Sequence, residues 1–363
     1  MSTVVLILGA LILLAATAIV YITLANRSPD MSRYDDPQPA MMVSRDKISE
    51  AHQTVIEKLA DYHAGPVAKD ISTGRRRFAS LFENTFDPAD DIRIKATDVD
   101  GIPGEWILAT NANPSNRLLY LHGGAFMVGS PATHRFITCE LARQTGAAVL
   151  AVDYRLMPEF TVLNSHEDAR SAYQWILTHG PDHEAPCSNL FVAGDSAGGA
   201  LTLATIAWAR DNGLQAADGA VAFAPSVDAS LSGPTWKTNL ATDYFLGPGL
   251  GRVLKIPAPI RSLLSRKQYG ESVTHPGLSP LFGDLGNLPP TLIQVSAEEM
   301  LYSDAVRYTN KAREAGSDVT LQVWPALVHV FQLFPELPES HDALCLAAEF
   351  ITSRVKQDRE PVT

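Results

Sequence analysis

The sequence predicts an α/β fold in which a mostly parallel central sheet carries helices on both of its faces. Short, continuous apolar runs alternate with segments of helical pattern. Strands that are apolar on both sides are typical of a parallel sheet, because helices cover both of its faces. The predicted strands are residues 118–121, 147–152, 189–193, 221–224, 291–295 and 319–324. The predicted helices are residues 135–144, 168–178, 197–210, 303–315 and 341–355.

The composition restricts the classes of protein to which the chain can belong. Its 363 residues are enough for one large α/β domain with additional segments, and 46% of them are hydrophobic, which argues against global disorder. The formal net charge of −11 argues against a general nucleic-acid binder, because an acidic surface repels phosphates. The three cysteines form no CxxC pair, which excludes a disulfide framework and a cysteine-rich zinc site.

The N-terminal segment differs from the rest of the chain, because its first 26 residues carry no charged side chain. Residues 3–25 form an apolar run that a helix would extend over about 35 Å, more than the roughly 30 Å of a bilayer core. A cleaved signal peptide would need a basic start and a shorter apolar stretch. The sequence therefore predicts a single-pass transmembrane anchor over residues 1–27, in preference to a cleaved signal or a buried helix.

The residues after this predicted anchor suggest its orientation and the domain boundaries. Arg27 and Arg33 follow the anchor and no basic residue precedes it, which favours a cytoplasmic location for the rest of the chain. Residues 28–42 are rich in Pro, Asp, Ser and Met and predict a linker. Residues 43–90 have apolar positions at helical spacing and predict cap helices, on which the arginine triplet 75–77 would be a solvated face.

The remaining residues, 91–363, are predicted to form the α/β domain. Residues 92–98 and 106–110 flank Asp100-Gly101 and predict a β-hairpin. Residues 227–274 interrupt the alternation of strands and helices and are rich in Gly, Pro, Ser and Lys. A long irregular stretch of this kind predicts an insertion that forms a lid or cap.

The strongest chemical signal is the hexapeptide Gly-Asp-Ser-Ala-Gly-Gly at residues 194–199, between a predicted strand and a predicted helix. It fits the pattern Gly-x-Ser-x-Gly, in which small residues allow a sharp strand–turn–helix connection. That turn raises the hydroxyl of Ser196 above the sheet, and the start of the helix directs N–H groups toward a developing anion. Ser196 is therefore the predicted nucleophile.

A second glycine-rich turn, His-Gly-Gly-Ala-Phe at residues 122–126, directly follows the predicted strand at residues 118–121. Its glycines allow backbone N–H groups to point into a cavity. Together with the N–H of Ala197, the N–H groups of Gly123 and Gly124 would form an oxyanion hole. His122 is expected to shape the loop and not to act as a base.

Acyl transfer also needs a base and an acid that orients it. His329 follows the last predicted strand, and a neutral imidazole there can take the Ser196 proton. Three carboxylates follow the fifth predicted strand. The spacing from the strand end favours Glu299 as the acid, with Glu298 and Asp304 as alternatives. Asp304 opens the next predicted helix and would otherwise cap it.

With these motifs, the sequence resembles the hormone-sensitive-lipase family of α/β-hydrolases, which includes bacterial esterases. The matching residues are His122-Gly123-Gly124, Asp153-Tyr154-Arg155, Pro158-Glu159, Gly194 to Gly199, Ser279-Pro280-Leu281 and His329-Val330-Phe331. The resemblance implies an α/β-hydrolase fold with a helical cap built from the N-terminal segment and the insertion. It also implies a Ser196–Glu299–His329 triad and an oxyanion hole at Gly123, Gly124 and Ala197.

The same resemblance implies hydrolysis of short- to medium-chain carboxylic esters, without a metal or a cofactor. The predicted anchor adds the expectation of a small-molecule or lipid ester that partitions into membranes. The alternatives are an amidase or deacetylase on the same triad and a non-catalytic ligand-binding protein of the same fold. Relatives dimerise through the edge of the last strand, so a homodimer is compatible with the sequence. Three departures from the family are Ala125 in place of a third glycine, Glu299 in place of a frequent Asp and Ser296 in place of a frequent Gly.

Overall fold

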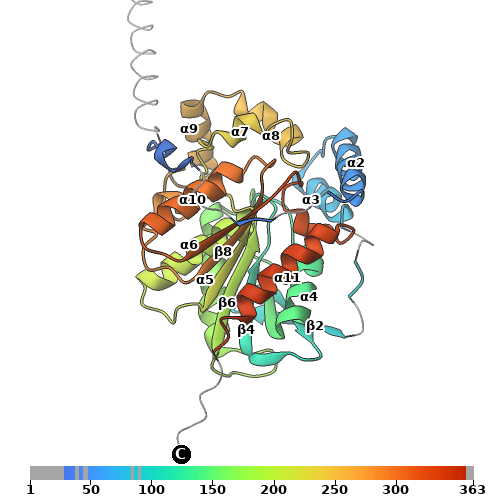
Figure 1. Ribbon diagram of the computed structural model, residues 1–363, viewed down its shortest axis with the longest axis vertical. Coiled ribbons are helices and arrows are strands. Elements are labelled where there is room, and N and C mark those ends of the chain that lie inside the picture. The colour runs from blue at the N-terminus through green and yellow to red at the C-terminus, as the bar shows by residue number, and fades with distance from the viewer. Residues whose placement is uncertain (1–27, 37–40, 44–47, 83–85, 89–90, 357–363) are drawn as a thin grey trace, which may run out of the picture.

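The computed structural model describes residues 28–36, 41–43, 48–82, 86–88 and 91–356, which build one nine-stranded sheet with helices on both faces (Figure 1). The predicted α/β architecture is thereby confirmed. The strands are β1 (Met41–Met42), β2 (Ile92–Val99), β3 (Ile102–Ala109), β4 (Asn113–Leu121), β5 (Ala147–Val152), β6 (Asn189–Asp195), β7 (Gly219–Phe223), β8 (Thr291–Ser296) and β9 (Val319–Trp324).

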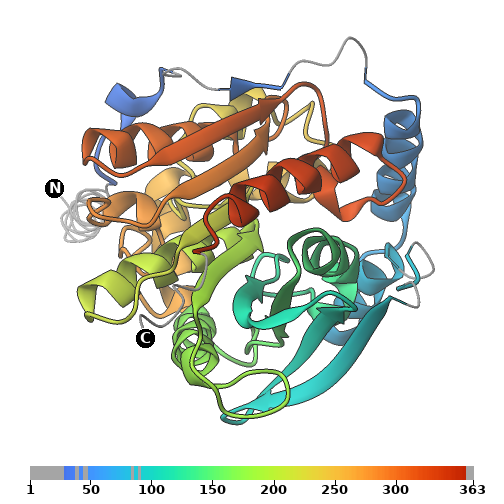
Figure 2. The ribbon, with the colours of Figure 1, turned by 60° about the horizontal axis from the view of Figure 1, so that its bottom comes forward.

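The sheet has the strand order β1-β9-β8-β7-β6-β4-β5-β3-β2 and twists from β1 at one edge to β2 at the other (Figure 2). All neighbouring strands pair in parallel except at β3, which is antiparallel to both β2 and β5. The predicted hairpin is this β2–β3 pair. Its turn residues Asp100 and Gly101 both have positive φ, as a two-residue hairpin turn requires.

Helices cover both faces of the sheet and also its carboxyl end. They are α2 (Ala51–Ala64), α3 (Ile71–Ser80), α4 (Arg135–Thr145), α5 (Val162–Thr178), α6 (Ala197–Asp211), α7 (Thr235–Thr238), α8 (Gly247–Leu254), α9 (Ala258–Tyr269), α10 (Tyr302–Glu314) and α11 (Pro338–Thr352). Short 3₁₀ turns form η1 (Ser32–Tyr34), η2 (Pro131–His134), η3 (Pro280–Phe282) and η4 (Phe331–Leu333).

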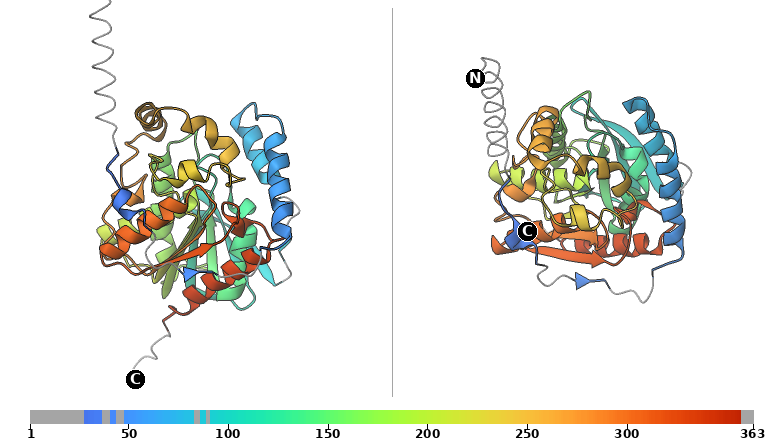
Figure 3. Two further views of the ribbon diagram at one scale, coloured as in Figure 1. Left: turned by 45° about the horizontal axis from the view of Figure 1, so that its top comes forward. Right: turned by 90° about the horizontal axis from the view of Figure 1, so that it is seen from above.

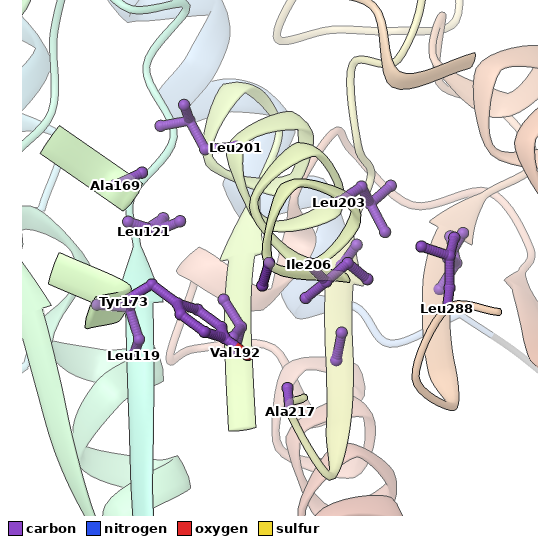
Figure 4. Packing of buried hydrophobic residues seen from close by; sticks show 14 of the residues in the cluster. Leu119, Leu121, Ala169, Tyr173, Val192, Leu201, Leu203, Ile206, Ala217 and Leu288 are labelled. Carbon is purple, nitrogen blue, oxygen red and sulfur yellow. The ribbon is translucent and has the colours of Figure 1, made fainter. Parts of the chain in front are cut away.

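Two apolar cores hold these layers together. The first lies between the sheet and α5, α6 and α10, and the second lies between the sheet and α4 and α11. Because side chains alternate along a strand, Leu119 and Leu121 of β4 enter the first core whereas Leu118 and Tyr120 enter the second. Figure 4 shows the first core, where Tyr173 of α5 lies beside Leu119 of β4 and Val192 of β6.

Two helices begin earlier than the sequence pattern predicts, and local capping explains both starts. α5 begins at Val162 because Thr161 and Asn164 form a capping box ahead of it. α11 begins at Pro338, since proline is favoured in the first helical turn, where its missing N–H has no role.

The helices of both segments predicted to form a cap lie over the carboxyl ends of the strands (Figures 1 and 3). α2 and α3 come from the N-terminal segment, and α7, α8 and α9 come from the insertion. Trp236 of α7 packs on Met300 and Leu301, which follow β8. The carboxyl ends of β4, β6, β8 and β9, which precede the predicted site residues, therefore face the cap.

The prediction of a linker over residues 28–42 needs correction for the part that the structure describes. Met31 and Tyr34 are buried in the first core, and Arg307 of α10 forms an ion pair with Asp35 at 2.5 Å. β1 pairs in parallel with the outer edge of β9. Residues 28–36, called the strap below, are therefore part of the domain, because Met31 and Tyr34 are buried in its core.

Two further predictions concern the membrane and the dimer. The predicted anchor, residues 1–27, lies outside the described residues. Within the described ranges, no helix is both long and apolar enough to cross a membrane.

The edge of β9, the surface through which a homodimer would form, already pairs with β1 of the same chain. A second copy that paired with Gln322 and Val323 of β9 would have to displace Met41 and Met42.

Candidate active site

Ser196 lies at the sharp turn between β6 and α6, with φ of 52° and ψ of −115°. The flanking glycines leave no room for a side chain. A Cβ on Gly198 would lie 1.9 Å from the carbonyl oxygen of Leu121, and one on Gly194 would lie 2.5 Å from that of Gly198. Real Cβ atoms essentially never approach so closely. The turn is therefore a nucleophile elbow, and glycine at positions 194 and 198 is what makes it sterically feasible.

The structure brings the three predicted catalytic side chains together. His329 lies after β9 and places Nε2 3.0 Å from Ser196 Oγ. Its Nδ1 lies 2.5 Å from Oε2 of Glu299, which follows β8. Only 3% of the His329 side chain and 1% of the Glu299 side chain are exposed, so little water competes for these contacts. Serine, imidazole and carboxylate thus form one continuous hydrogen-bonded chain.

The two other carboxylates considered as the acid have different surroundings. Asp304 is buried and accepts hydrogen bonds from Trp236 Nε1 at 2.9 Å and from the N–H groups of Val227 and Asp228, both at 3.1 Å. It therefore fastens α7 and the start of the insertion to α10. Glu298 is partly exposed and contributes its backbone carbonyl to Thr242 Oγ1.

The electrostatics of the pair favour a proton on Nδ1 of His329. Burial raises the pKa of Glu299, and the hydrogen bond from His329 only partly offsets this effect. Burial alone would lower the pKa of His329, but the hydrogen bond and the charge of Glu299, together with Asp243, raise it above its usual value of 6.5. Glu299 also accepts a hydrogen bond from the N–H of Ser296 at 2.6 Å, which fixes the carboxylate in position.

The structure differs from the predicted oxyanion hole at Gly123. Its N–H donates to Asp195 Oδ1 at 2.9 Å and points away from the hole. A Cβ on Gly123 would lie 2.0 Å from Asp195 Oδ2, so this glycine serves a close packing contact. In the described part of the chain, the N–H groups of Gly124, Ala125 and Ala197 have no acceptor. Ala125 and Ala197 line the same cavity as Ser196.

Asp195 is a site residue that the sequence analysis did not single out. It is buried next to the nucleophile and accepts hydrogen bonds from Tyr120 Oη at 2.8 Å and from Gly123. Burial acts to raise its pKa, but His134, Tyr120 and His122 lower the pKa below its usual value. Asp195 thus joins the elbow to the glycine-rich loop. Its place directly before Ser196 was the only signal in the sequence.

His122 shapes the loop, as expected, and stays neutral. Its ring stacks on Tyr154 with 4.3 Å between the ring centroids, and its Nδ1 lies 2.7 Å from the carbonyl oxygen of Gly123. Burial lowers the pKa of His122 to about 3. A ring that stays neutral at physiological pH and packs against tyrosine adds no positive charge to the glycine-rich loop.

An apolar cavity of about 330 Å³ adjoins Ser196 under the cap. Its walls come from both the catalytic domain and the insertion. The apolar lining residues are Ala125, Phe126, Met127, Met157, Val162, Ala197, Ala229, Leu231, Trp236, Leu246, Leu250, Val253, Leu278 and Leu301. A cavity of this size and lining suits a small apolar group held next to the nucleophile. Among the described residues, no group of three or more His, Cys, Asp or Glu side chains could hold a metal ion.

Arg75 is a second residue whose place the sequence did not reveal, since its triplet has the pattern of a solvated face. From α3 it donates to the carbonyl oxygens of Met127 and Met157, both at 2.9 Å, and forms an ion pair with Glu159 at 2.7 Å. Met127 and Met157 both line the cavity beside Ser196. Arg75 thus fastens an N-terminal cap helix to two walls of the site.

We expect Arg75→Ala to lower kcat/KM for ester hydrolysis by about tenfold, because charge-assisted hydrogen bonds to two carbonyls of the cavity walls are lost. The matched control is Arg76→Ala, since among the described residues Arg76 donates hydrogen bonds only to Ser72 and Thr73 of its own helix. Steady-state kinetics on both variants check the expectation. Equal kcat/KM values for the two variants would show that the hydrogen bonds of Arg75 to Met127 and Met157 do not position the cavity walls.

These observations define a class of protein: an α/β-hydrolase fold whose elbow serine is linked to histidine and glutamate beneath a cap. Comparison with known proteins agrees. The family described as the alpha/beta hydrolase fold matches residues 118–333, more than half of the chain. An acetyl-hydrolase of Streptomyces hygroscopicus is 37% identical over 248 residues, which cover 68% of this chain and 78% of that protein.

Two further similar proteins indicate to which family of α/β-hydrolases the chain belongs. An esterase of Acinetobacter venetianus is 32% identical and covers 72% of this chain and 82% of its own length. The crystal structure of an esterase from the bacterial hormone-sensitive lipase family matches with a TM-score of 0.77 at 34% identity, covering 85% of this chain and all of that one. The chain belongs to the hormone-sensitive lipase family of α/β-hydrolases. It is a serine hydrolase that acts on carboxylic esters.

Proposed function

We propose that the chain hydrolyses short- to medium-chain carboxylic esters through an acyl-enzyme on Ser196. In this proposal His329 is the general base and Glu299 is the triad carboxylate that orients it. The observation that carries this proposal is the contact of Ser196 Oγ with His329 Nε2 at 3.0 Å, at the wall of an apolar cavity. The cavity volume of about 330 Å³ favours a short or medium acyl chain over a long one.

The reaction follows from this geometry. His329 Nε2 takes the proton of Ser196 as Oγ attacks the ester carbonyl, and the imidazolium then gives that proton to the departing alcohol. A water molecule, activated by the same imidazole, attacks the acyl-enzyme and releases the carboxylic acid. Glu299 accepts the Nδ1 proton in a hydrogen bond throughout, which orients the ring and stabilises its positive charge.

A series of p-nitrophenyl esters tests the substrate class. We expect the acetate, butyrate and octanoate to be hydrolysed with higher kcat/KM than the palmitate, because the cavity is small. The anilide counterpart of the acetate tests the amidase alternative, and we expect slower turnover of the anilide. A maximum at palmitate would contradict the acyl-chain assignment, and faster anilide cleavage would favour the amidase.

The developing oxyanion is proposed to bind to the N–H groups of Gly124, Ala125 and Ala197. A trifluoromethyl ketone adds to an active serine as a tetrahedral adduct and provides the test. In amide NMR spectra of the adduct we expect downfield shifts for these three N–H groups. Gly123 is expected to shift less, because Asp195 already accepts its hydrogen bond. A shift at Gly123 larger than at Gly124 and Ala125 would restore the hole predicted from the sequence.

Residues 1–27 are proposed to anchor the protein in a membrane, with the catalytic domain on the cytoplasmic side. The uncharged first 26 residues and the two following arginines support this proposal. The full chain should then stay in the membrane pellet after extraction with alkaline carbonate. Release into the supernatant would contradict the anchor. Protease treatment of sealed vesicles then reports the side on which the domain lies.

A further inference from the structure

The outer face of α9 carries three exposed apolar side chains. Ile260, Leu263 and Leu264 are exposed to 49%, 42% and 53%. Their spacing of three and four residues places them on one side of the helix. Single exposed apolar residues are ordinary on protein surfaces, but a group on one helix face more often marks a binding surface.

The opposite face of α9 is a wall of the active site. Arg261, Ser265, Gln268 and Tyr269 recur at helical spacing and line the cavity that contains Ser196. Arg261 also donates to the carbonyl oxygen of Ser230 at 3.0 Å, which fastens the helix to the start of the insertion. One helix therefore separates the cavity from the exposed apolar face.

The charge of this region is opposite to that of the chain. The 27 residues between Asp243 and Glu271, which include α8 and α9, hold five basic and no acidic side chains, whereas the whole chain has a net charge of −11. Arg252, Lys255 and Arg266 are exposed. Basic residues around the apolar face of a short helix are typical of helices that lie in the surface of an anionic bilayer.

The described chain also begins beside this face. The N-terminal described segment, which contains η1, contacts α10 and lies toward the cap end of the molecule near α9 in Figure 1. Arg307 of α10 binds both Asp35 of the strap and Ser232 Oγ, close to the Ser230 carbonyl that α9 binds. An anchor formed by residues 1–27 would therefore enter the bilayer on the side of the molecule where α9 is exposed.

We propose that the outer face of α9 binds the surface of an anionic phospholipid bilayer, so that the cavity takes esters dissolved in that bilayer. Ile260, Leu263 and Leu264 enter the boundary between headgroups and acyl chains, and the exposed basic residues meet the lipid phosphates. This proposal rests on the proposed anchor and ester hydrolysis and specifies the substrate: an ester with a short or medium acyl group and a lipophilic alcohol.

A depth measurement on the full chain in vesicles tests the contact. A fluorophore is attached to the thiol introduced by Leu263→Cys, in a variant that also carries Cys345→Ser, while labelled Cys345 of the natural chain is the control. Cys345 is exposed on α11, away from α9, whereas Cys139 and Cys187 are buried. In phosphatidylglycerol-containing vesicles with brominated acyl chains, we expect loss of fluorescence at position 263 and none at position 345.

Flotation of the same vesicles separates the possible failures. Protein that floats without quenching at position 263 would overturn the α9 contact and leave the anchor standing. Protein that does not float would overturn both. Shielding of the label at position 263 without vesicles would show that the face binds a second copy instead. Quenching that is as strong in neutral vesicles at high salt would overturn the role of the basic residues.

Activity provides an independent readout. In the variant Ile260→Ser, Leu263→Ser, Leu264→Ser, none of the changed residues lines the cavity. We expect hydrolysis of dissolved p-nitrophenyl acetate to be unchanged, and hydrolysis of hexadecyl acetate in vesicles to fall by on the order of tenfold or more. Val67→Ser, at an apolar position on the other part of the cap with 86% exposure, is the control and should change neither rate. Unchanged vesicle hydrolysis in the triple variant would overturn the proposal, whereas an inactive wild type would instead contradict the proposed function.

Discussion

Replacing Ser196 by alanine is expected to lower kcat for ester hydrolysis by on the order of 10⁶, as in other serine triads. The reason is that Oγ is the atom that forms the acyl-enzyme, and among the described residues no other hydroxyl is bonded to His329 Nε2. The fold should be retained, because alanine removes one partly exposed atom and keeps the Cβ at the turn. The measurement is turnover of p-nitrophenyl acetate, with circular dichroism as a check on folding.

Ser265→Ala is the matched control for this experiment. Ser265 lines the same cavity from α9, but it is Ser196, not Ser265, whose hydroxyl is bonded to His329 Nε2. We expect its kcat to stay close to that of the natural chain. If Ser196→Ala keeps a kcat within about tenfold of the natural chain, Ser196 is not the nucleophile.

Replacing Glu299 by glutamine is expected to lower kcat by about 10⁴, the effect of the corresponding amide substitution in other triads. Glutamine has nearly the same shape but can present an N–H₂ to His329 Nδ1, so the ring loses the tautomer that accepts the Ser196 proton. The amide also cannot stabilise the imidazolium that forms during attack. Steady-state kinetics on the folded variant give the value.

The pH profile adds a readout that a merely structural role for Glu299 would not change. His329 must be neutral to act as a base, so kcat/KM is low below its pKa and rises as the pH passes through it. Because Glu299 raises the pKa of His329, the limb in the natural chain lies above pH 6.5. In Glu299→Gln the limb should move to lower pH. An unmoved limb would contradict the proposed pair.

Two neighbouring carboxylates supply controls for the acid. Glu298→Gln should be fully active, because the Glu298 side chain is partly exposed and apart from His329. Asp304→Asn should keep most of the activity, because the Asp304 carboxylate bonds to Trp236 and to backbone N–H groups of the insertion and not to His329. An inactive Glu298→Gln beside an active Glu299→Gln would reverse the assignment.

Much of the sheet could be predicted because its signals are local. Continuous apolar runs identify β5 to β9 and the end of β4, and Asp100-Gly101 identifies the hairpin. The elbow is likewise local, since Gly194 and Gly198 are required by contacts within a few residues of Ser196 and by the adjacent strand end. Because β8 and β9 are adjacent and parallel, Glu299 and His329, which follow them, lie together at the carboxyl ends of the strands. Their positions in the sequence predicted this.

The features that the sequence did not reveal depend on contacts between distant residues. The local sequence His-Gly-Gly-Ala does not show that the Asp195 side chain accepts a hydrogen bond from the N–H of Gly123. Because of this bond, the N–H groups of Gly-Gly-Ala that remain free in the described part of the chain are those of Gly124 and Ala125. The role of Arg75 depends on carbonyls more than 50 residues away. The strap at residues 28–36 has a loop-like composition. It is part of the domain because Tyr34 is buried in the first core, a contact that its own sequence does not reveal.

Reaction with a fluorophosphonate reports directly whether Ser196 is an activated nucleophile, because this reagent forms a stable phosphonyl ester with an activated serine. We predict that the folded full chain is labelled once, that the adduct lies on the peptide containing Ser196, and that His329→Ala largely prevents labelling. Absence of labelling in folded protein, or an adduct on another serine with Ser196 unmodified, would contradict the account.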